Sequence, residues 1–201
     1  MTPVRVQPNE VATLRLETAR LILRPPLRED FEPWAELIGD AVAARFIGGP
    51  QPRNGAWRSA MTMAGAWYLE GFAMFSVLEK ASGRWVGRVG PWLPAGWPGT
   101  EIGWSIVPAR WGRGYAVEAA AAAIDWAFDR LGWDEIIHVI DPENVASQRV
   151  AIKLGSRNRG RGRLPPPYDG HTIDIWGQTR EEWRQRQAEH ASAGIERPTR
   201  S

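Results

Sequence analysis

The chain of 201 residues contains no cysteine, and it contains only three histidines. The absence of cysteine excludes disulfides, thiolate zinc sites and a cysteine nucleophile, so any acyl transfer is expected to pass directly from donor to acceptor. The three histidines, His138, His171 and His190, lie far apart and offer no metal-ligand spacing. We therefore expect no metal site.

Long apolar runs are also missing. No stretch approaches the roughly 18 apolar residues of a membrane span, and the first ten residues lack the apolar core of a secretion signal. We expect a cytoplasmic protein that makes no contact with a membrane. The polar or proline-bearing ends predict a flexible N-terminal segment over 1–13 and a flexible C-terminal tail over 190–201, around a single domain over 14–189.

Apolar periodicity and turn residues predict one α/β domain in which strands and helices alternate around a mixed sheet. Predicted strands cover 21–24, 72–78, 85–89, 101–107, 136–140, 157–163 and 172–176. Predicted helices begin at Glu29-Asp30 and cover 57–69, 115–131 and 145–154.

The most informative segment joins the strand Glu101–Val107 to an alanine-rich helix that begins near Tyr115. Gly112 and Gly114 remove side chains where an anion would approach the backbone. The helix turns its unpaired N–H groups and the positive end of its dipole toward the same point. The turn is therefore predicted to bind a phosphate.

Arg110 and Arg113 are predicted to add positive charge at the rim of this turn. No Lys-Ser/Thr pair follows the glycines, and the third glycine of a dinucleotide loop is absent. Nucleotide hydrolysis and hydride transfer are both disfavoured.

Four further matches accompany this turn in a fixed order. They are LETARLILRP at 16–25, EIGW at 101–104, NVASQRVAIKLG at 144–155 and TREEW at 179–183. Together with WGRGYA at 111–116, they resemble the GNAT superfamily of N-acetyltransferases, in particular the Rim-type branch that acetylates protein N-termini. The resemblance implies an acyl-CoA N-acyltransferase fold with a central mixed, mostly antiparallel sheet flanked by helices. It also implies acetyl-CoA as cosubstrate and a primary amine, of a peptide N-terminus or a small molecule, as acceptor.

The resemblance further implies the roles of individual residues. Glu101 would remove a proton from the acceptor amine through a water, and Ser147 would donate a proton to the leaving CoA thiolate. The backbone of Ile106 and Val107 would pair with pantetheine as an added strand does. The implied cofactor-binding set is Ile106, Val107, Trp111, Gly112, Arg113, Gly114, Tyr115, Ala116 and Asn144. Two positions depart from the family pattern: Trp111 replaces Gln or Arg, and Ser156 replaces an aromatic and is predicted to loosen packing beside the acceptor.

Each of these roles has a simpler alternative. Glu101 can be a strand-end glutamate in solvent, and Asn144 can serve only as a helix N-cap. Ser147 can be a serine that merely falls in a first helical turn. The protein as a whole can be a silent acyl-CoA-binding sensor or interaction module, and its 12 tryptophans leave room for a homodimer.

Charge placement bears on the acceptor. No carboxylate occurs from Ala41 to Leu69, a segment that contains Arg45, Arg53 and Arg58. The four arginines Arg157, Arg159, Arg161 and Arg163 alternate, which on a regular strand places them on one face. Either set would repel a polycation, so a neutral or acidic acceptor is favoured. A charged edge strand is the alternative reading of the second set, and nucleic-acid binding is disfavoured because no aromatic residues are interleaved.

Overall fold

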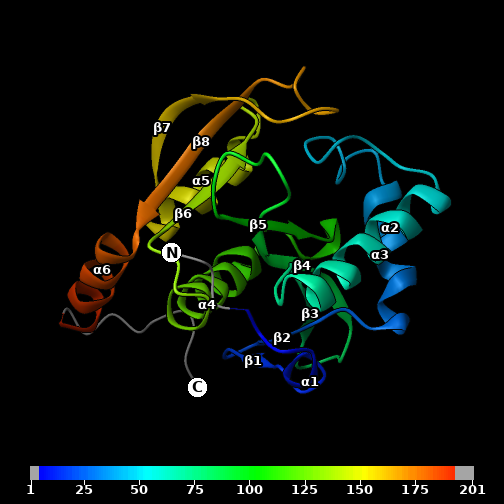
Figure 1. Ribbon diagram of the computed structural model, residues 1–201, viewed down its shortest axis with the longest axis horizontal. Coiled ribbons are helices and arrows are strands. Elements are labelled where there is room, and N and C mark those ends of the chain that lie inside the picture. Colours follow the sequence, from blue (N-terminus) through cyan, green and yellow to red (C-terminus); the bar gives the residue numbers. More distant parts are fainter. Residues whose placement is uncertain (1–4, 193–201) are drawn as a thin grey trace.

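The computed structural model describes residues 5–192, and its centre is an eight-stranded sheet with the order β1-β2-β3-β4-β5-β6-β8-β7 (Figure 1). Its strands are β1 (Leu16–Glu17), β2 (Leu21–Arg24), β3 (Phe75–Glu79), β4 (Trp85–Trp92), β5 (Glu101–Ile106), β6 (Glu135–Ile140), β7 (Arg157–Gly162) and β8 (Ile173–Thr179). Every neighbouring pair is antiparallel except β5 and β6, which are parallel. The predicted fold class, a mixed and mostly antiparallel sheet flanked by helices, is confirmed.

Six α-helices and two short 3-10 helices are present among the described residues. They are α1 (Pro8–Val11), η1 (Arg28–Asp30), α2 (Phe31–Gly39), α3 (Arg53–Leu69), η2 (Pro108–Arg110), α4 (Tyr115–Arg130), α5 (Val145–Leu154) and α6 (Arg180–Ser192). In residues 5–192 none of these helices has the length and apolar character that a membrane crossing requires.

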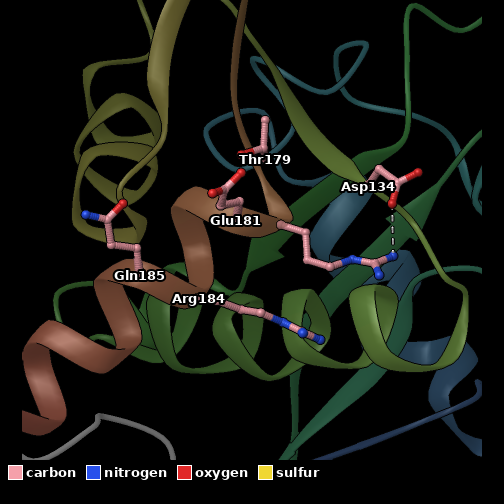
Figure 2. Close-up of a pocket in the computed structure, with 6 residues that line it drawn as sticks. Asp134, Thr179, Glu181, Arg184 and Gln185 are labelled. Atoms are coloured by element: carbon pink, nitrogen blue, oxygen red, sulfur yellow. Dashed lines mark ion pairs between the residues drawn. The ribbon is translucent and has the colours of Figure 1, made fainter.

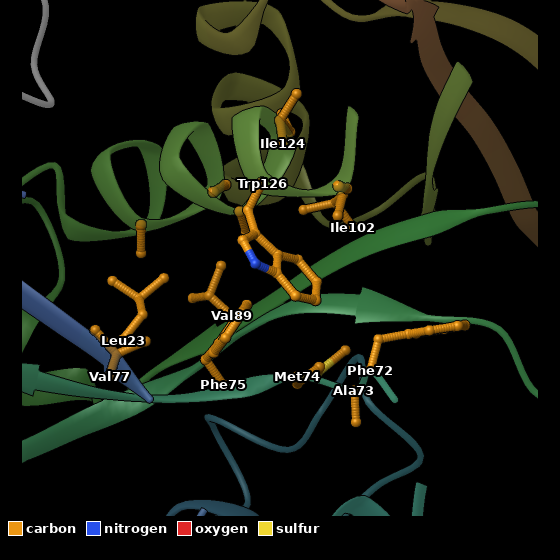
Figure 3. Packing of buried hydrophobic residues seen from close by; sticks show 14 of the residues in the cluster. Leu23, Phe72, Ala73, Met74, Phe75, Val77, Val89, Ile102, Ile124 and Trp126 are labelled. Carbon is orange, nitrogen blue, oxygen red and sulfur yellow. The ribbon is translucent and has the colours of Figure 1, made fainter. Parts of the chain in front are cut away.

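Helix α4 covers one face of the sheet and forms the core with β2 to β5 (Figure 3). The alanine-rich sequence of α4 lets its axis approach the strands closely, while Trp126 fills the space that remains. The Trp126 ring meets Phe75 edge-on with centroids 5.2 Å apart, and it lies 5.8 Å from Trp67 at the end of α3. This packing fixes the second half of α4 against β3 and α3.

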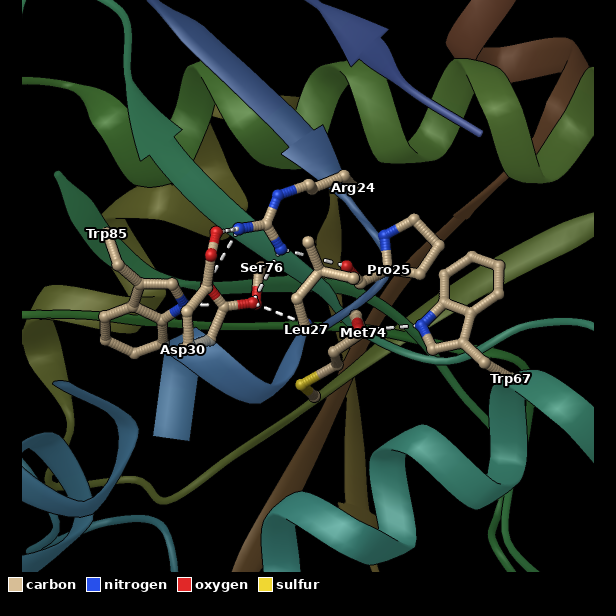
Figure 4. A network of polar contacts seen from close by, with 9 residues as sticks. Arg24, Pro25, Leu27, Asp30, Trp67, Met74, Ser76 and Trp85 are labelled. Carbon is tan, nitrogen blue, oxygen red and sulfur yellow. Dashed lines mark hydrogen bonds and ion pairs between the residues drawn. The ribbon is translucent and has the colours of Figure 1, made fainter. Parts of the chain in front are cut away.

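Helix α2 is fixed to the other face by a buried polar network (Figure 4). Asp30 accepts two hydrogen bonds from Arg24, at 2.7 and 2.9 Å, and a third at 2.7 Å from the hydroxyl of Ser76. The Ser76 oxygen in turn accepts a hydrogen bond from the Trp85 indole at 3.1 Å. Because each buried group has a partner, the network sets the position of α2 over β4.

The two halves of the sheet diverge between β5 and β6. These parallel strands pair only at Glu101 and Ile137, and beyond this position no strand of the described chain pairs with β5 on that side. We call the space between the diverging strands the splay.

Most predicted elements are confirmed, and the differences have local causes. The strand predicted from Phe72 begins at Phe75, and the Met74 carbonyl accepts the Trp67 indole N–H instead of joining the ladder. Strand β4 continues through Pro91 because the β3 ladder has already ended at Val89, so no partner there needs the missing N–H.

Helix α6 was not predicted, since its apolar residues lack helical periodicity and only Trp183 is buried. The predicted domain limits of 14 and 189 remain a prediction. One helical turn, α1, lies before this range, and α6 extends past its end to Ser192. Residues 1–4 and 193–201, which belong to the predicted flexible ends, lie outside the described residues.

Candidate functional site

The glycine turn before α4 has the geometry of an anion site. Gly112 and Gly114 adopt φ angles of 74° and 81°, the left-handed region that favours glycine. Gly114 is the N-cap of α4 and, having no side chain, makes no side-chain capping bond. The first helical N–H groups of α4 are therefore available to a ligand.

A second layer of contacts holds this turn in place. Glu118 of α4 is fully buried and accepts hydrogen bonds from the Thr18 hydroxyl at 2.6 Å and from the Arg20 backbone N–H at 2.9 Å. The Arg20 guanidinium pairs with Glu118 and also donates to the Arg113 carbonyl at 2.9 Å. The LETARL motif between β1 and β2 thus clamps the turn to the first turn of α4.

Arg110 was predicted from the sequence to add positive charge at the rim of the turn, but the structure pairs it with a carboxylate. Its guanidinium makes two hydrogen bonds to Glu79, at 3.1 and 3.0 Å, and Glu79 also accepts the Tyr115 hydroxyl at 2.7 Å. Hydrogen bonds from Ser82, Tyr115 and Arg110 hold the pKa of Glu79 at about 2. The positive charge of Arg110 is consequently neutralised by Glu79, because that carboxylate stays ionised.

The backbone groups that face the splay differ in part from those predicted. The Val107 N–H donates to the Val86 carbonyl at 3.0 Å, so it points toward β4 and is not open. The Ile106 carbonyl accepts the indole N–H of Trp111 at 2.6 Å. Since backbone groups alternate sides along a strand, the Trp104 N–H and C=O and the Ile106 N–H face the splay. The backbone of Trp104, which the sequence analysis did not select, is the better candidate for pairing with a ligand.

Asn144 and Ser147 lie across the splay at the start of α5. The Asn144 side chain accepts the Ser147 backbone N–H at 3.1 Å, which confirms its predicted role as N-cap. The Ser147 hydroxyl oxygen accepts the Trp104 indole N–H at 3.2 Å. This bond leaves the hydroxyl proton free to be donated elsewhere, and it positions the hydroxyl against β5.

Glu101 lies at the point where the two strands part. Its side chain is buried, which contradicts the alternative of a solvent-exposed strand end. The carboxylate accepts the Trp97 indole N–H at 2.5 Å and the Val139 backbone N–H at 3.3 Å. Burial raises the pKa of Glu101 to about 7, although these two hydrogen bonds and the charge of Arg88 oppose the shift. A carboxylate with this pKa accepts a proton much more readily than an exposed glutamate does.

His138 and Ser156 form a polar contact beneath the splay. The His138 Nδ1 lies 2.7 Å from the Ile102 carbonyl and Nε2 lies 2.9 Å from the Ser156 hydroxyl. The first distance requires a proton on Nδ1, and burial lowers the pKa of His138 to about 4, so the ring is neutral. Gln178 also donates to Ser156 at 2.9 Å. Ser156 was predicted to loosen the packing, but it is buried and fully engaged in hydrogen bonds.

Arg88 is a site residue that sequence reasoning missed. It lies on β4, with its guanidinium 4.9 Å from the centroid of the Trp34 ring of α2. A cation over a desolvated aromatic face gains about 2 kcal/mol, whereas desolvation costs an ion several kcal/mol. Burial accordingly lowers the pKa of Arg88 to about 10, while the charge of Glu101 raises it. Its flanking residues, WVGRVGPW, carry no motif that marks it.

Two of the three arginines in the first set are paired with carboxylates, while Arg58 makes no ion pair within residues 5–192. Arg45 pairs with Glu143 at 2.9 Å, and Arg53 pairs with Glu32 at 2.6 Å. Both acids come from outside the carboxylate-free segment, so the segment's composition did not reveal them.

The arginines of β7 do not share one face. The register shifts between Asn158 and Arg161, so that Arg157 lies opposite Gly177 and Arg161 lies opposite Asp174. Gly177 and Asp174 are three residues apart on β8, which places the two arginines on opposite faces. Each of the three arginines of β7 also lies within 4.0 Å of a carboxylate, whereas Arg163 lies beyond the end of the strand. Most of the positive charge from which a neutral or acidic acceptor was inferred is therefore paired with carboxylates, and the charge of the acceptor stays a prediction.

A hollow beside α6 is a poor candidate for the reaction (Figure 2). Its lining includes Asp134 and Arg180, which pair at 3.3 Å, together with Thr179, Glu181, Arg184 and Gln185. Neither the glycine turn nor Glu101 contributes to it. The described residues also contain no group of three or more His, Asp or Glu side chains placed to hold a metal ion.

Known proteins resemble this chain over the segment that contains the residues of this site. Residues 20–157 match the family model described as an acetyltransferase (GNAT) domain. The chain is 26% identical to the uncharacterized N-acetyltransferase YoaA of Bacillus subtilis over 168 residues, which span 80% of this chain and 95% of YoaA. It is 36% identical to the uncharacterized protein YkkB of the same organism over 87 residues, which span 42% of this chain and 51% of YkkB.

Solved structures show the same fold. An acetyltransferase from Agrobacterium tumefaciens superposes with a TM-score of 0.73 at 27% identity, covering 83% of this chain and 95% of the other. RimJ of Mycobacterium smegmatis, solved in complex with CoA-disulfide, superposes with a TM-score of 0.66 at 21% identity, covering 90% and 94% of the two chains.

Proposed function

Because this chain belongs to the GNAT acetyltransferase family, whose cosubstrate is acetyl-CoA, we propose that it transfers the acetyl group directly to a primary amine of low pKa, with Glu101 as general base. One observation carries this proposal: Glu101 is a buried carboxylate with a pKa of about 7 at the point where β5 and β6 part. At neutral pH about half of this group is ionised, and its conjugate acid is weak enough to make it an effective proton acceptor.

The residues around the splay fit acetyl-CoA. The N–H groups at Gly112–Ala116 and the side chain of Arg113 would hold the pyrophosphate. The open backbone of Trp104 and Ile106 would pair with the amide groups of pantetheine, as an added strand pairs with a sheet edge, with Val107 and Trp111 beside it. Asn144 would contact the same arm from α5. When bound, acetyl-CoA supplies an activated thioester.

Each protein group then has a defined task. Glu101 takes the proton of the attacking amine, directly or through a water. Of the groups that face the splay, the Trp104 N–H stabilises negative charge on the carbonyl oxygen, which is usually the largest single term in acyl transfer, and the Trp104 C=O and the Ile106 N–H are left to pair with pantetheine. The Ser147 hydroxyl donates its proton to the departing thiolate and takes another from solvent, while the Trp104 indole holds its oxygen at 3.2 Å.

The pKa of Glu101 favours an acceptor that is already partly neutral. An α-amino group with a pKa of about 7.7–8.0 is roughly a tenth neutral at pH 7, whereas a lysine amine near 10.4 is neutral about four times in ten thousand. A peptide N-terminus or a small α-amine therefore suits the site better than a lysine side chain.

The test is release of CoA thiol by wild type and by Glu101→Gln with a panel of α-amines. We expect the variant to lose about 10²–10⁴-fold in kcat and to lose the ionisation near pH 7 from its pH profile. Acetyl-CoA should still raise its Tm, because the cofactor contacts lie elsewhere. Glu143→Gln, an exposed glutamate with 73% of its side chain accessible, is the matched control.

Two results would contradict the proposal. Full turnover by Glu101→Gln at pH 7 would show that this residue is not the base. A wild-type protein that binds acetyl-CoA but releases no thiol with any amine would instead be the silent sensor or interaction module.

A further inference from the structure

Arg88 and Glu101 project from the same face of the sheet. Strands β4 and β5 pair Arg88 with Ser105 and Trp92 with Glu101, and directly opposed residues share a face. Between these two pairs lies Gly90 opposite Gly103, so neither strand raises a Cβ there, and the methyl group of Met74 packs over Gly103. The charge of each group also shifts the pKa of the other, in agreement with their shared face.

The guanidinium of Arg88 has no polar partner in the described part of the chain. Its Nε is buried and makes no hydrogen bond, and the side chain takes part in no ion pair within residues 5–192. The Trp34 ring offsets only part of the cost of desolvating the charge. Most other arginines near this face are already neutralised, as Arg24 is by Asp30 and Arg53 by Glu32. Arg88 is thus a positive charge, held rigidly by α2, that can still accept an anion.

An anion at Arg88 would be recognised by its geometry and by its charge. A guanidinium presents parallel N–H groups that match the two oxygens of a carboxylate. One arginine balances one negative charge, whereas a phosphate dianion would leave an excess of negative charge beside Glu101. The chemistry therefore favours a carboxylate.

We propose that Arg88 binds a carboxylate of the acceptor, so that the substrates of this enzyme are amines that carry a carboxylate near the amino group, as free amino acids do. The guanidinium would also offset the carboxylate charge, which otherwise raises the pKa of the amine above that of a peptide N-terminus. This inference rests on the proposed acetyl transfer and narrows its acceptor. Bound in this way, the carboxylate lies against Arg88 while the amine of the same molecule reaches Glu101. Arg88 is then a specificity-determining residue, and Trp34 positions it.

The experiment compares L-amino acids with their carboxamides as acceptors in the thiol-release assay, for wild type, Arg88→Met and Arg88→Lys. Wild type should favour each acid over its amide in kcat/KM, after correction for the neutral fraction of each amine. Arg88→Met should lose roughly 10- to 100-fold with the acids and far less with the amides, as expected for a hydrogen-bonded charge. Arg88→Lys keeps the charge but lacks the parallel N–H groups of a guanidinium, so its kcat/KM with the acids should fall between those of wild type and Arg88→Met. Arg184→Met, at an exposed arginine of α6, is the matched control.

A second measurement separates this inference from the proposed function. Calorimetry with CoA present should show that N-acetylalanine binds wild type more tightly than its amide does, and that Arg88→Met removes the difference. This readout needs no turnover, so it remains decisive if no amine releases thiol.

The inference is overturned if Arg88→Met lowers kcat/KM equally for acids and amides and shifts both pH profiles alike. Arg88 would then act only by tuning Glu101. Equal use of acids and amides by the wild type would also overturn it while leaving acetyl transfer intact. Preserved Tm values in the variants establish that the comparison is made on folded protein.

Discussion

Replacing Glu101 by Gln should stabilise the fold above pH 7 even as it removes activity. In the folded chain the carboxyl keeps its proton up to a pH of about 7, whereas in the unfolded chain it loses that proton near 4.5. Between these values the folded state binds more protons, so the stability of the wild type falls as pH rises. With a difference of roughly 2.5 pKa units, this loss amounts to about 3 kcal/mol by pH 8.

His138 acts in the opposite direction over nearly the same range. Its pKa falls from 6.5 in the unfolded chain to about 4 in the folded one, so the unfolded state binds more protons between these values. Its contribution to stability is present above pH 6.5 and is lost as pH falls toward 4. In the wild type the opposite effects of Glu101 and His138 on the pH dependence of the unfolding free energy largely cancel. In Glu101→Gln only the effect of His138 remains.

The assay is urea-induced unfolding of both proteins at half-unit steps from pH 4 to pH 8.5. The difference in unfolding free energy between variant and wild type should be small near pH 4.5, where both side chains are neutral. It should grow by about 1.4 kcal/mol per pH unit toward pH 7 and then level off. A difference that stays constant from pH 4.5 to 8.5 would refute the elevated pKa, and with it the case for Glu101 as a base tuned by burial. Glu143→Gln, at an exposed glutamate, is the matched control.

Two further predictions concern the cofactor and the leaving group. Acetyl-CoA at a hundred times its Kd should stabilise the wild type by about 2.7 kcal/mol and raise its Tm. Gly114→Val should abolish this rise, because valine disfavours a φ of 81° and its side chain fills the anion site. A Tm shift that survives in Gly114→Val would mean that the pyrophosphate binds elsewhere. Ser147→Ala should lower kcat by no more than about tenfold and leave the KM for acetyl-CoA nearly unchanged, since a thiol of pKa about 8.5 is a tolerable leaving group. A loss as large as that of Glu101→Gln would make Ser147 an obligatory acid.

The parts of the site that the sequence predicted are those made by neighbouring residues. The glycine turn, the start of α4 and the cap at Asn144 each depend on a few consecutive residues whose backbone preferences are strong. Glu101 was selected because the family resemblance implies a base at the residue that opens the strand leading into that turn. Its burial and raised pKa were not predictable, because distant segments bury the carboxyl, and this burial outweighs the opposing hydrogen bonds from Trp97 and from the Val139 N–H of β6.

The parts that were missed or wrong depend on contacts between distant segments. Arg45 is neutralised by Glu143, which lies 98 residues further along the chain. Arg88 gains its environment from a helix that precedes it by about fifty residues and from the strand that follows it. The faces of β7 were reversed by a single extra residue, because side chains alternate with a period of two. Composition and spacing carry no information on any of these.

The early end of the pairing between β5 and β6 explains both the open backbone that can bind a ligand and the position of the proposed base. If β6 continued to pair with β5 beyond Ile137, the Trp104 backbone would be consumed by the ladder and no ligand could use it. The divergence would leave the buried Ile102 carbonyl without a partner, which costs about 1–3 kcal/mol. The His138 ring supplies that partner at 2.7 Å, and Ser156 and Gln178 support the ring from behind. His138 therefore offsets the cost of the divergence. Glu101 occupies the last paired position of β5, beside the open backbone, which is where a base can reach an amine that attacks a thioester bound there.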